Sequence, residues 1–415
     1  MSRASASPSV IEDGPWTAYQ KWLVGLTAIT VVFDGMDNQL LGITIPALTA
    51  DWHVARSAFS PVVSLGFVGM MIGGAVAGFW GDRVGRRTAL LTCLAAFGVC
   101  TLAIAFIDGI AALGALRFLT GLGLGGALPN ATSLAAEYVP RNRRALAVTI
   151  TIVCVPLGGT LAGLFAIRAL PVFGWRGMFV TGGVLPLLIA AALLRLLPES
   201  PRFLAVRAGR IATPDGAAVR VRDLFMPDYL RDTLALWMAF FSCLLSVYLG
   251  FSWLPSIIAG AGLGPAVASS GITVFNLGGV VGALCGGALI TRFGSRTTML
   301  AMAAGAVAGA FVLSRMPLHA GSDVARLLVL LAFTGGLINA VQTTMYALAA
   351  HVYPTMMRST GVGTAGAVGR LGAVLSGYAG PWALAYAGTA SFFALMGGAV
   401  FVTLIALACV RRHIE

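Results

Sequence analysis

The sequence contains few charged residues for its length. Only 10% of its 415 residues are Asp, Glu, Lys or Arg, whereas 58% are hydrophobic. A soluble domain carries about 25% charged residues, so this composition excludes a water-soluble globule and a disordered chain. The net charge of +12 does not indicate nucleic-acid binding, because the basic residues lie in short gaps between apolar runs, where membrane proteins place them.

Motifs for metal binding, disulfide frameworks and ATP hydrolysis are also missing. The six cysteines fall inside apolar runs without a CxxC pair, so neither a zinc site nor a disulfide framework is expected. The sequence has no H-E-x-x-H motif, no grouped histidines and no P-loop, which argues against a membrane metalloenzyme and an ATP-driven pump. We expect no cofactor, no metal and no cleavable signal peptide, because the first twenty residues are polar.

Long apolar segments dominate what is present. A helix needs about 20 apolar residues to cross a bilayer, and the chain offers twelve such segments. Their approximate ranges are 22–48, 59–80, 88–107, 110–134, 145–168, 176–197, 233–257, 266–290, 296–314, 325–350, 358–380 and 386–410. We therefore predict an all-α integral membrane protein with two six-helix bundles, at 22–197 and 233–410, joined by a polar linker at 198–232 and flanked by tails at 1–21 and 411–415.

Lys and Arg are divided unevenly between the two ends of these predicted spans. Even-numbered loops and the two tails hold 20 of the 27 basic residues, and odd-numbered loops hold five. The positive-inside rule therefore places both termini and the linker in the cytoplasm. We expect a monomeric, multi-pass protein of a bacterial inner membrane, surrounded by lipid.

The two halves carry the same marks at matching places. The segment Gly-Asp-Arg-Val-Gly-Arg-Arg at 81–87 follows the second span, and a similar segment at 290–296 follows the eighth. Pro140 and Arg144, which close the fourth span, recur 214 residues later at the close of the tenth as Pro354 and Arg358, and His351 lies at the position that corresponds to Glu137. Internal repeats of this kind are typical of secondary transporters.

These segments resemble the major facilitator superfamily. Besides 81–87, the similarity includes Arg-Phe-Leu-Thr-Gly at 117–121 and Pro-Glu-Ser-Pro-Arg at 198–202. A narrower match is Asp-Gly-Met-Asp at 34–37, which is similar to the D-G-x-D signature of the aromatic acid:proton symporter family. The resemblance implies proton-coupled uptake of an aromatic carboxylate, such as a hydroxybenzoate or hydroxyphenylpropionate, by alternating access. The alternative is a proton-coupled transporter of another small organic acid, a sugar or a drug; a receptor is less favoured, because no additional soluble domain is evident.

Asp34 and Asp37 are the candidate proton-coupling residues. They lie three residues apart, on one face of the first predicted span. A carboxylate near the middle of a bilayer costs several kcal/mol unless it is paired, hydrated or protonated, and repulsion between the two favours the protonated form of at least one. The alternative is that the aspartates form a structural pair with an arginine.

Arg117 and Arg370 are the two cations predicted to lie inside spans. Because a guanidinium can bind both oxygens of a carboxylate, we expect one of them to bind the substrate; either could instead neutralise an aspartate. Five other residues are candidates for binding ring hydroxyls or stacking on a ring, with interhelical hydrogen bonding as the alternative: Asn38, Tyr248, Asn276, Gln342 and Tyr346.

Charged residues also gather at the expected cytoplasmic edge of the spans. Their predicted role is an ion-pair latch that breaks when the site opens inward, although plain topogenic charge is an alternative for the arginines. The candidates are Asp82, Arg83, Arg86, Arg87, Glu137, Arg144 and Arg358. Because an acidic residue does not serve positive-inside sorting, we expect Asp82 to have a partner, either Arg144 or the start of the eleventh span near Arg358.

Overall fold

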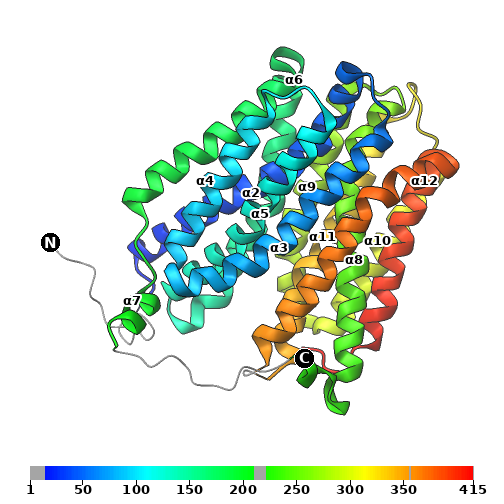
Figure 1. Ribbon diagram of the computed structural model, residues 1–415. Helices are drawn as coiled ribbons and strands as arrows, with labels where there is room; N and C mark the ends of the chain where they lie inside the picture. Colours follow the sequence, from blue (N-terminus) through cyan, green and yellow to red (C-terminus); the bar gives the residue numbers. More distant parts are fainter. Residues whose placement is uncertain (1–14, 210–220, 355–356, 415) are drawn as a thin grey trace.

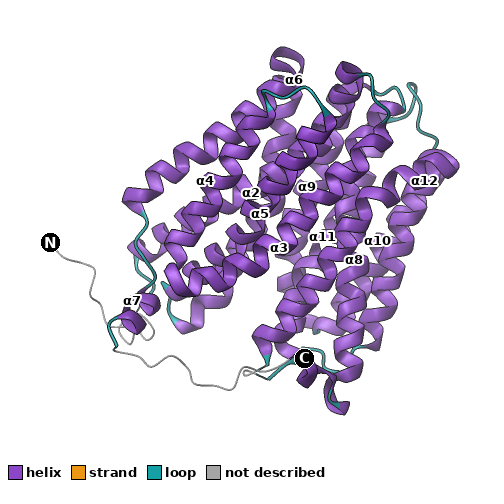
Figure 2. Ribbon diagram, viewed as in Figure 1, coloured by secondary structure: helices purple, strands orange, loops and turns teal. Residues whose placement is uncertain are grey.

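The computed structural model describes residues 15–209, 221–354 and 357–414, and this part of the chain is helical with short loops and no strand (Figure 2). The first half contains five long helices: α2 (Ala18–Trp52), α3 (Ser60–Val84), α4 (Arg86–Ile104), α5 (Ile110–Glu137) and α6 (Arg144–Leu196), with 3-10 turns at Arg56–Phe59 (η1) and Arg141–Arg143 (η2). The second half contains another five: α8 (Pro227–Gly260), α9 (Gly264–Phe293), α10 (Ser295–Arg315), α11 (Val324–Val352) and α12 (Arg358–Cys409). Between the halves lie α7 (Pro201–Arg207) and a 3-10 turn, η3 (Val221–Phe225).

Two of these helices each contain two membrane spans. Helices α6 and α12 have 53 and 52 residues, which would make straight rods of about 80 Å at 1.5 Å per residue, far longer than a bilayer is thick. Each is interrupted by a glycine with positive φ, Gly174 (φ 62°, ψ −170°) and Gly388 (φ 66°, ψ −146°), a conformation essentially restricted to glycine. Figure 1 shows the chain turning back at these ends of α6 and α12.

The prediction of twelve spans is confirmed. Nine helices in the described part of the chain are long and apolar enough to cross a membrane, and two of them are the double-length α6 and α12. Helix α2 has 35 residues and also has the length of a span, although it carries several charged residues. The spans begin and end a few residues away from the predicted limits: α2 begins at Ala18 rather than residue 22, and α8 begins at Pro227, inside the segment predicted as linker.

The two halves repeat the same packing. In the first half α2 packs on α6, α3 on α5 and α4 on α5, and in the second half α8 packs on α12, α9 on α11 and α10 on α11. Equivalent helices thus have equivalent neighbours, as expected for two six-helix repeats. We call the end of the molecule that carries α7 and the C-terminal tail the linker end, and the opposite end, where α6 and α12 turn back, the reversal end (Figure 1).

The halves contact each other at the reversal end. Ser64 Oγ of α3 donates a hydrogen bond of 2.8 Å to the Val374 carbonyl of α12, and a Cβ on Gly42 of α2 would lie 2.3 Å from the Phe251 carbonyl of α8. On α3 and α12 this contact extends as far as Met70, whose carbonyl accepts a hydrogen bond of 3.1 Å from Arg370.

Toward the linker end α3 and α12 separate. Gly78 lies two helical turns beyond Met70, and Gly366 and Gly363 lie one and two turns from Arg370 in the same direction. Among the described residues, no neighbouring heavy atom lies within 4 Å of a Cβ built on any of these three glycines. The molecule is therefore closed at the reversal end and open at the linker end.

Candidate functional site

Asp37 forms a buried ion pair inside the first half. Its Oδ2 lies 3.1 Å from Arg117 Nη1 of α5, and its Oδ1 accepts a hydrogen bond of 2.5 Å from Thr101 Oγ1 of α4. Asp37 is 1% exposed and Arg117 is 6% exposed. Three helices of one half thus neutralise and hydrogen-bond this carboxylate, which is the structural pairing considered as the alternative role for the aspartates.

Asp34 lies one turn nearer the linker end and has a different environment. It is 2% exposed and accepts a hydrogen bond of 3.2 Å from Asn38 Nδ2, the next turn of the same helix. In the described part of the chain no cation lies within ion-pair distance of Asp34, although the charge of Arg370 acts on it through space. The sequence does not distinguish the two aspartates, but in the structure Asp37 forms an ion pair and Asp34 does not.

Arg370 of α12 lies where the two halves meet. Its Nη1 donates to the neutral carbonyl of Met70, and Gly74 of α3 leaves room for the guanidinium, because a Cβ there would lie 2.2 Å from Nη1. Its charge acts on Asp34, Tyr248 and Tyr346. Unlike Arg117, Arg370 therefore keeps a positive charge that no contacting carboxylate of the described chain neutralises.

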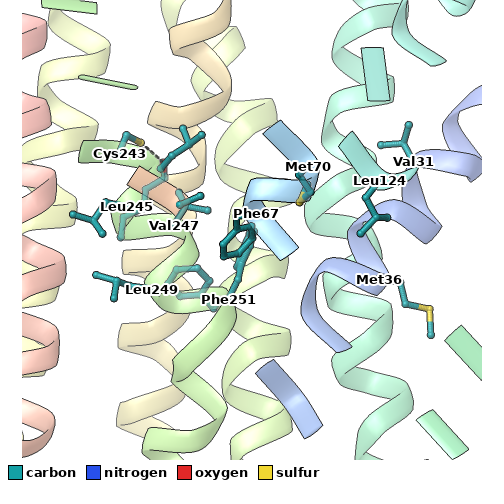
Figure 3. Packing of buried hydrophobic residues seen from close by; sticks show 14 of the residues in the cluster. Val31, Met36, Phe67, Met70, Leu124, Cys243, Leu245, Val247, Leu249 and Phe251 are labelled. Carbon is teal, nitrogen blue, oxygen red and sulfur yellow. Dashed lines mark hydrogen bonds between the residues drawn. The ribbon is translucent and has the colours of Figure 1, made fainter. Parts of the chain in front are cut away.

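Aromatic side chains surround this position. The Tyr248 ring of α8 packs edge-on against Phe67 of α3, with centroids 4.5 Å apart, and against Phe251, with centroids 5.6 Å apart. Tyr346 of α11 packs edge-on against Phe240 at 5.0 Å. Figure 3 shows Phe67 and Met70 of the first half facing Phe251 of the second. The arrangement combines one cation with aromatic surfaces from both halves, in the middle of the membrane-spanning region.

The other predicted substrate-binding residues occupy different places. Asn38 lies with Arg117 and Ser252 on a narrow cavity of about 10 Å³ between the halves. Asn276 is fully buried and pairs with Gln39, a residue that the sequence analysis missed although it continues the polar run from Asp34 to Asn38. Gln342 is half-buried on α11. In the part of the chain that the structure describes, no group of His, Cys, Asp and Glu side chains could hold a metal ion.

The predicted latch residues are gathered at the linker end, mostly in the first half. Asp82 contacts Arg86 at 2.5 Å, and Arg86 Nη1 lies 3.4 Å from Asn130 Oδ1 of α5. Arg83 and Arg86 line a wide groove with Glu137 and the α7 segment. Arg144 and the region of Arg358, the predicted partners of Asp82, lie at the first residues of α6 and α12. With the halves separated at the linker end, the ion pair that Asp82 forms is with Arg86.

Glu199, also missed in the sequence analysis, ties the segment before α7 to the first half. Its Oε1 accepts a hydrogen bond of 2.9 Å from the Arg87 amide at the start of α4, where a negative charge is favoured by the helix dipole. The Arg87 guanidinium donates to the Leu194 carbonyl, and Ser200 Oγ donates to Glu137. Arg87 and Glu137 thus hold the segment after α6 in place, which indicates a structural contribution alongside any gating role.

Comparison with known proteins identifies the chain's relatives. The Major Facilitator Superfamily profile matches residues 27–318 and, in a second match, 260–414. The chain is 36% identical to the gallate transporter of Pseudomonas putida (96% of this chain, 93% of that one) and 35% identical to the 4-hydroxybenzoate transporter PcaK of Pseudomonas aeruginosa (89% and 87%). It is 34% identical to the 3-(3-hydroxy-phenyl)propionate transporter of Escherichia coli (85% and 84%).

Solved structures share the fold. A D-xylose-proton symporter aligns with a TM-score of 0.77 at 18% identity, covering 95% of this chain and 99% of that one. The inward-open conformation of the xylose transporter XylE from E. coli aligns with a TM-score of 0.75 at 16% identity, covering 94% and 96%. At these identities the likeness concerns the fold alone.

The different environments of the two aspartates predict different effects of the same substitution. Asp37→Asn leaves the Arg117 guanidinium buried without its counter-charge, so we expect a loss of about 3–5 kcal/mol in stability and a clearly lower unfolding temperature of the purified protein in detergent. Asp34→Asn is the matched control, because it breaks no ion pair, and its unfolding temperature should stay close to wild type. Equal losses in both variants would contradict this assignment; the double variant Asp37→Asn/Arg117→Gln should recover part of the loss.

Proposed function

The chain belongs to the Major Facilitator Superfamily. We propose that it takes up an aromatic carboxylate together with protons by alternating access. Like its relatives, it is a transporter and not an enzyme. The relatives that cover most of its length carry gallate, 4-hydroxybenzoate or 3-(3-hydroxyphenyl)propionate. The observation that carries the proposal is Arg370, a mid-membrane cation whose hydrogen-bond partner is a neutral carbonyl and which is surrounded by aromatic side chains.

Arg370, rather than Arg117, binds the substrate's carboxylate in this proposal. Arg117 already contacts Asp37, and releasing it would leave a buried carboxylate unpaired. Arg370 can exchange the Met70 carbonyl for a carboxylate, and a charge-assisted, bidentate contact is the stronger interaction. Tyr248 and Tyr346 then offer ring surfaces to the aromatic part of the substrate. A neutral sugar would leave the Arg370 charge without a counter-ion, which favours an anion over a sugar.

Asp34 is the proton carrier in this proposal. An ionised Asp34 and an ionised substrate are both stabilised by the same cation, Arg370, which acts on Asp34 through space, because no cation forms an ion pair with Asp34 in the described part of the chain. When the substrate's carboxylate binds Arg370, a second negative charge nearby becomes unfavourable and Asp34 takes up a proton. When the substrate leaves, Asp34 can release its proton and supply the counter-charge. Sharing one cation between two acids thus links the movement of substrate and proton.

The structure is interpreted as the inward-facing state. We propose that this end and both termini lie in the cytoplasm of a bacterial cell, with the protein in its inner membrane; the concentration of basic residues at the linker end supports this orientation. The halves are separated at that end and in contact at the reversal end. Rocking of one half against the other around Arg370 would close the linker end and expose the site to the outside.

Transport into proteoliposomes tests the proposed activity. With an imposed inward proton gradient, labelled 4-hydroxybenzoate, 3-(3-hydroxyphenyl)propionate or benzoate should accumulate, and D-xylose should not. A protonophore should abolish accumulation because it removes the driving gradient, whereas replacing sodium by choline should have no effect. Accumulation that requires sodium and resists the protonophore would refute proton coupling.

Substitution of the arginines tests how the carboxylate is bound. Lysine keeps the positive charge but loses the planar guanidinium that can bind both carboxylate oxygens. Arg370→Lys should therefore make the free energy of binding of an aromatic acid less favourable by about 1–3 kcal/mol, the range for a charged hydrogen bond. Titration of the purified protein measures this, and Arg117→Lys is the control, which should change stability more than affinity. The neutral amide of the same acid should bind poorly to the wild type; equal affinity for acid and amide would contradict the role of Arg370.

Asp82 is expected to set the balance between the two conformations without touching substrate. Its side chain lies at the linker end of α3, 66% exposed, three helical turns from Met70 and the Arg370 contact. Asp82→Asn should slow turnover while binding to the inward-facing state is kept or tightened, because the contact that we expect Asp82 to form when the linker end closes is lost. Thiol accessibility from the cytoplasmic side should rise in this variant but not in the control Asp228→Asn, at the exposed start of α8. Lost binding with unchanged accessibility would place Asp82 in the site or in folding.

A further inference from the structure

Two amide side chains join the halves of the molecule. Gln39 Nε2 of α2 donates to Asn276 Oδ1 of α9, and Asn276 Nδ2 donates back to Gln39 Oε1, each at 2.8 Å. Asn276 Nδ2 also donates to the Ile272 carbonyl of its own helix. Both side chains are 0% exposed. We call this pair the amide clasp.

The clasp lies within the closed region. A Cβ on Gly159 of α6 would lie 2.0 Å from Gln39 Nε2 and 2.8 Å from Asn276 Oδ1, so only glycine leaves room for the two amides here. Four residues further toward the reversal end, Gly163 packs against Thr273 of α9. Closure of the reversal end thus continues from Gly163 inward to the clasp, and Gln39 follows Asp37 and Asn38 directly in sequence.

Opening of the reversal end must separate the two amides. Helix α2 belongs to the first half and α9 to the second, so the reciprocal hydrogen bonds persist only while these helices are in contact. An amide without a partner in a low-dielectric site is costly. Each amide then needs another group that both donates and accepts hydrogen bonds, and a phenolic hydroxyl has this property.

We propose that the amide clasp closes the reversal end of the empty transporter and that, once this end opens, Gln39 and Asn276 bind a ring hydroxyl of the incoming aromatic acid. Gln39 is then a specificity residue that acts with Asn276. The identity of the ligand rests on the proposed function, whereas the closing role does not. Because sites that hydrogen-bond a hydroxyl discriminate strongly against analogues that lack it, hydroxylated acids are preferred over benzoate.

The closing role is tested without substrate. Spin labels on Ser57→Cys and Ala266→Cys, exposed positions in different halves at the reversal end, report its opening by pulsed electron resonance, with the exposed Cys285 and Cys409 replaced by serine. Gln39→Met or Asn276→Leu should raise the ratio of long to short distances about 10-fold, as expected for the loss of a buried hydrogen-bonded pair. Asn339→Leu is the control, because this buried amide donates to the Gly335 carbonyl of its own helix and does not join the halves; its distance distribution should stay unchanged.

Two double variants separate clasp formation from general disruption. Gln39→Asn with Asn276→Gln keeps the combined length of the two side chains and should restore the short distance. Gln39→Met with Asn276→Leu removes both polar groups, leaves no orphaned amide, and should recover much of the short distance as well. Unchanged distances in both single variants would overturn the closing role.

The specificity role is tested by binding. The ratio of the Kd for benzoate to that for 4-hydroxybenzoate should fall by about 10-fold in the double apolar variant, although its reversal end closes again. An unchanged ratio in that variant would overturn the specificity role. If the wild type binds none of the aromatic acids while the single variants still open the reversal end, the proposed function fails and the closing role stands.

Discussion

The high cost of an unpaired charge in the membrane governs the centre of this protein. Three helices of the first half hold Asp37, Arg117 and Thr101 in one buried group, which is electrically satisfied within that half. A unit of this kind can move as a rigid body, because its charges keep their partners whichever way the half tilts. Asp34 and Arg370 do not belong to this group. They lie on opposite halves, where the charge of Arg370 acts on Asp34 without direct contact. One half thus carries a closed ion pair, and the interface carries the two charges to which we assign the coupling of substrate and proton.

Much of the architecture could be predicted from the sequence, because long apolar segments identify membrane spans without any information about tertiary contacts. The twelve spans and the repeat were predictable on this basis. The limits of the spans were less so: the apolar run of the seventh span starts near residue 233, but Pro227 starts the helix earlier, since proline fits the first turn of a helix. The break at Gly174 lies in the predicted connection between the spans at 145–168 and 176–197, but the sequence did not show that the residues around it stay helical.

The site was predictable in its members but not in its pairing. Asp34 and Asp37 differ by one turn and look alike in sequence, and only packing shows that Arg117 and Thr101 contact the second. Asn276 stood out as a polar residue in an apolar span, but Gln39 did not, because it follows three polar residues that explained the run already. Glu199 was read as part of a motif, whereas its role comes from the amide at the start of α4, which no local pattern reveals.

The turns at Gly174 and Gly388 have a consequence for how the protein enters the bilayer. A reversal made by one or two residues leaves no loop, so we expect the spans on either side of it to be inserted together as a helical hairpin. In the proposed orientation this insertion carries Arg176 across the membrane beside the turn. Its two ion-pair partners, Asp51 at the end of α2 and Asp108 in the loop before α5, belong to segments synthesised earlier. Both aspartates are therefore expected to have crossed the membrane before Arg176 does, so that the arginine finds its ion-pair partners in place when it arrives.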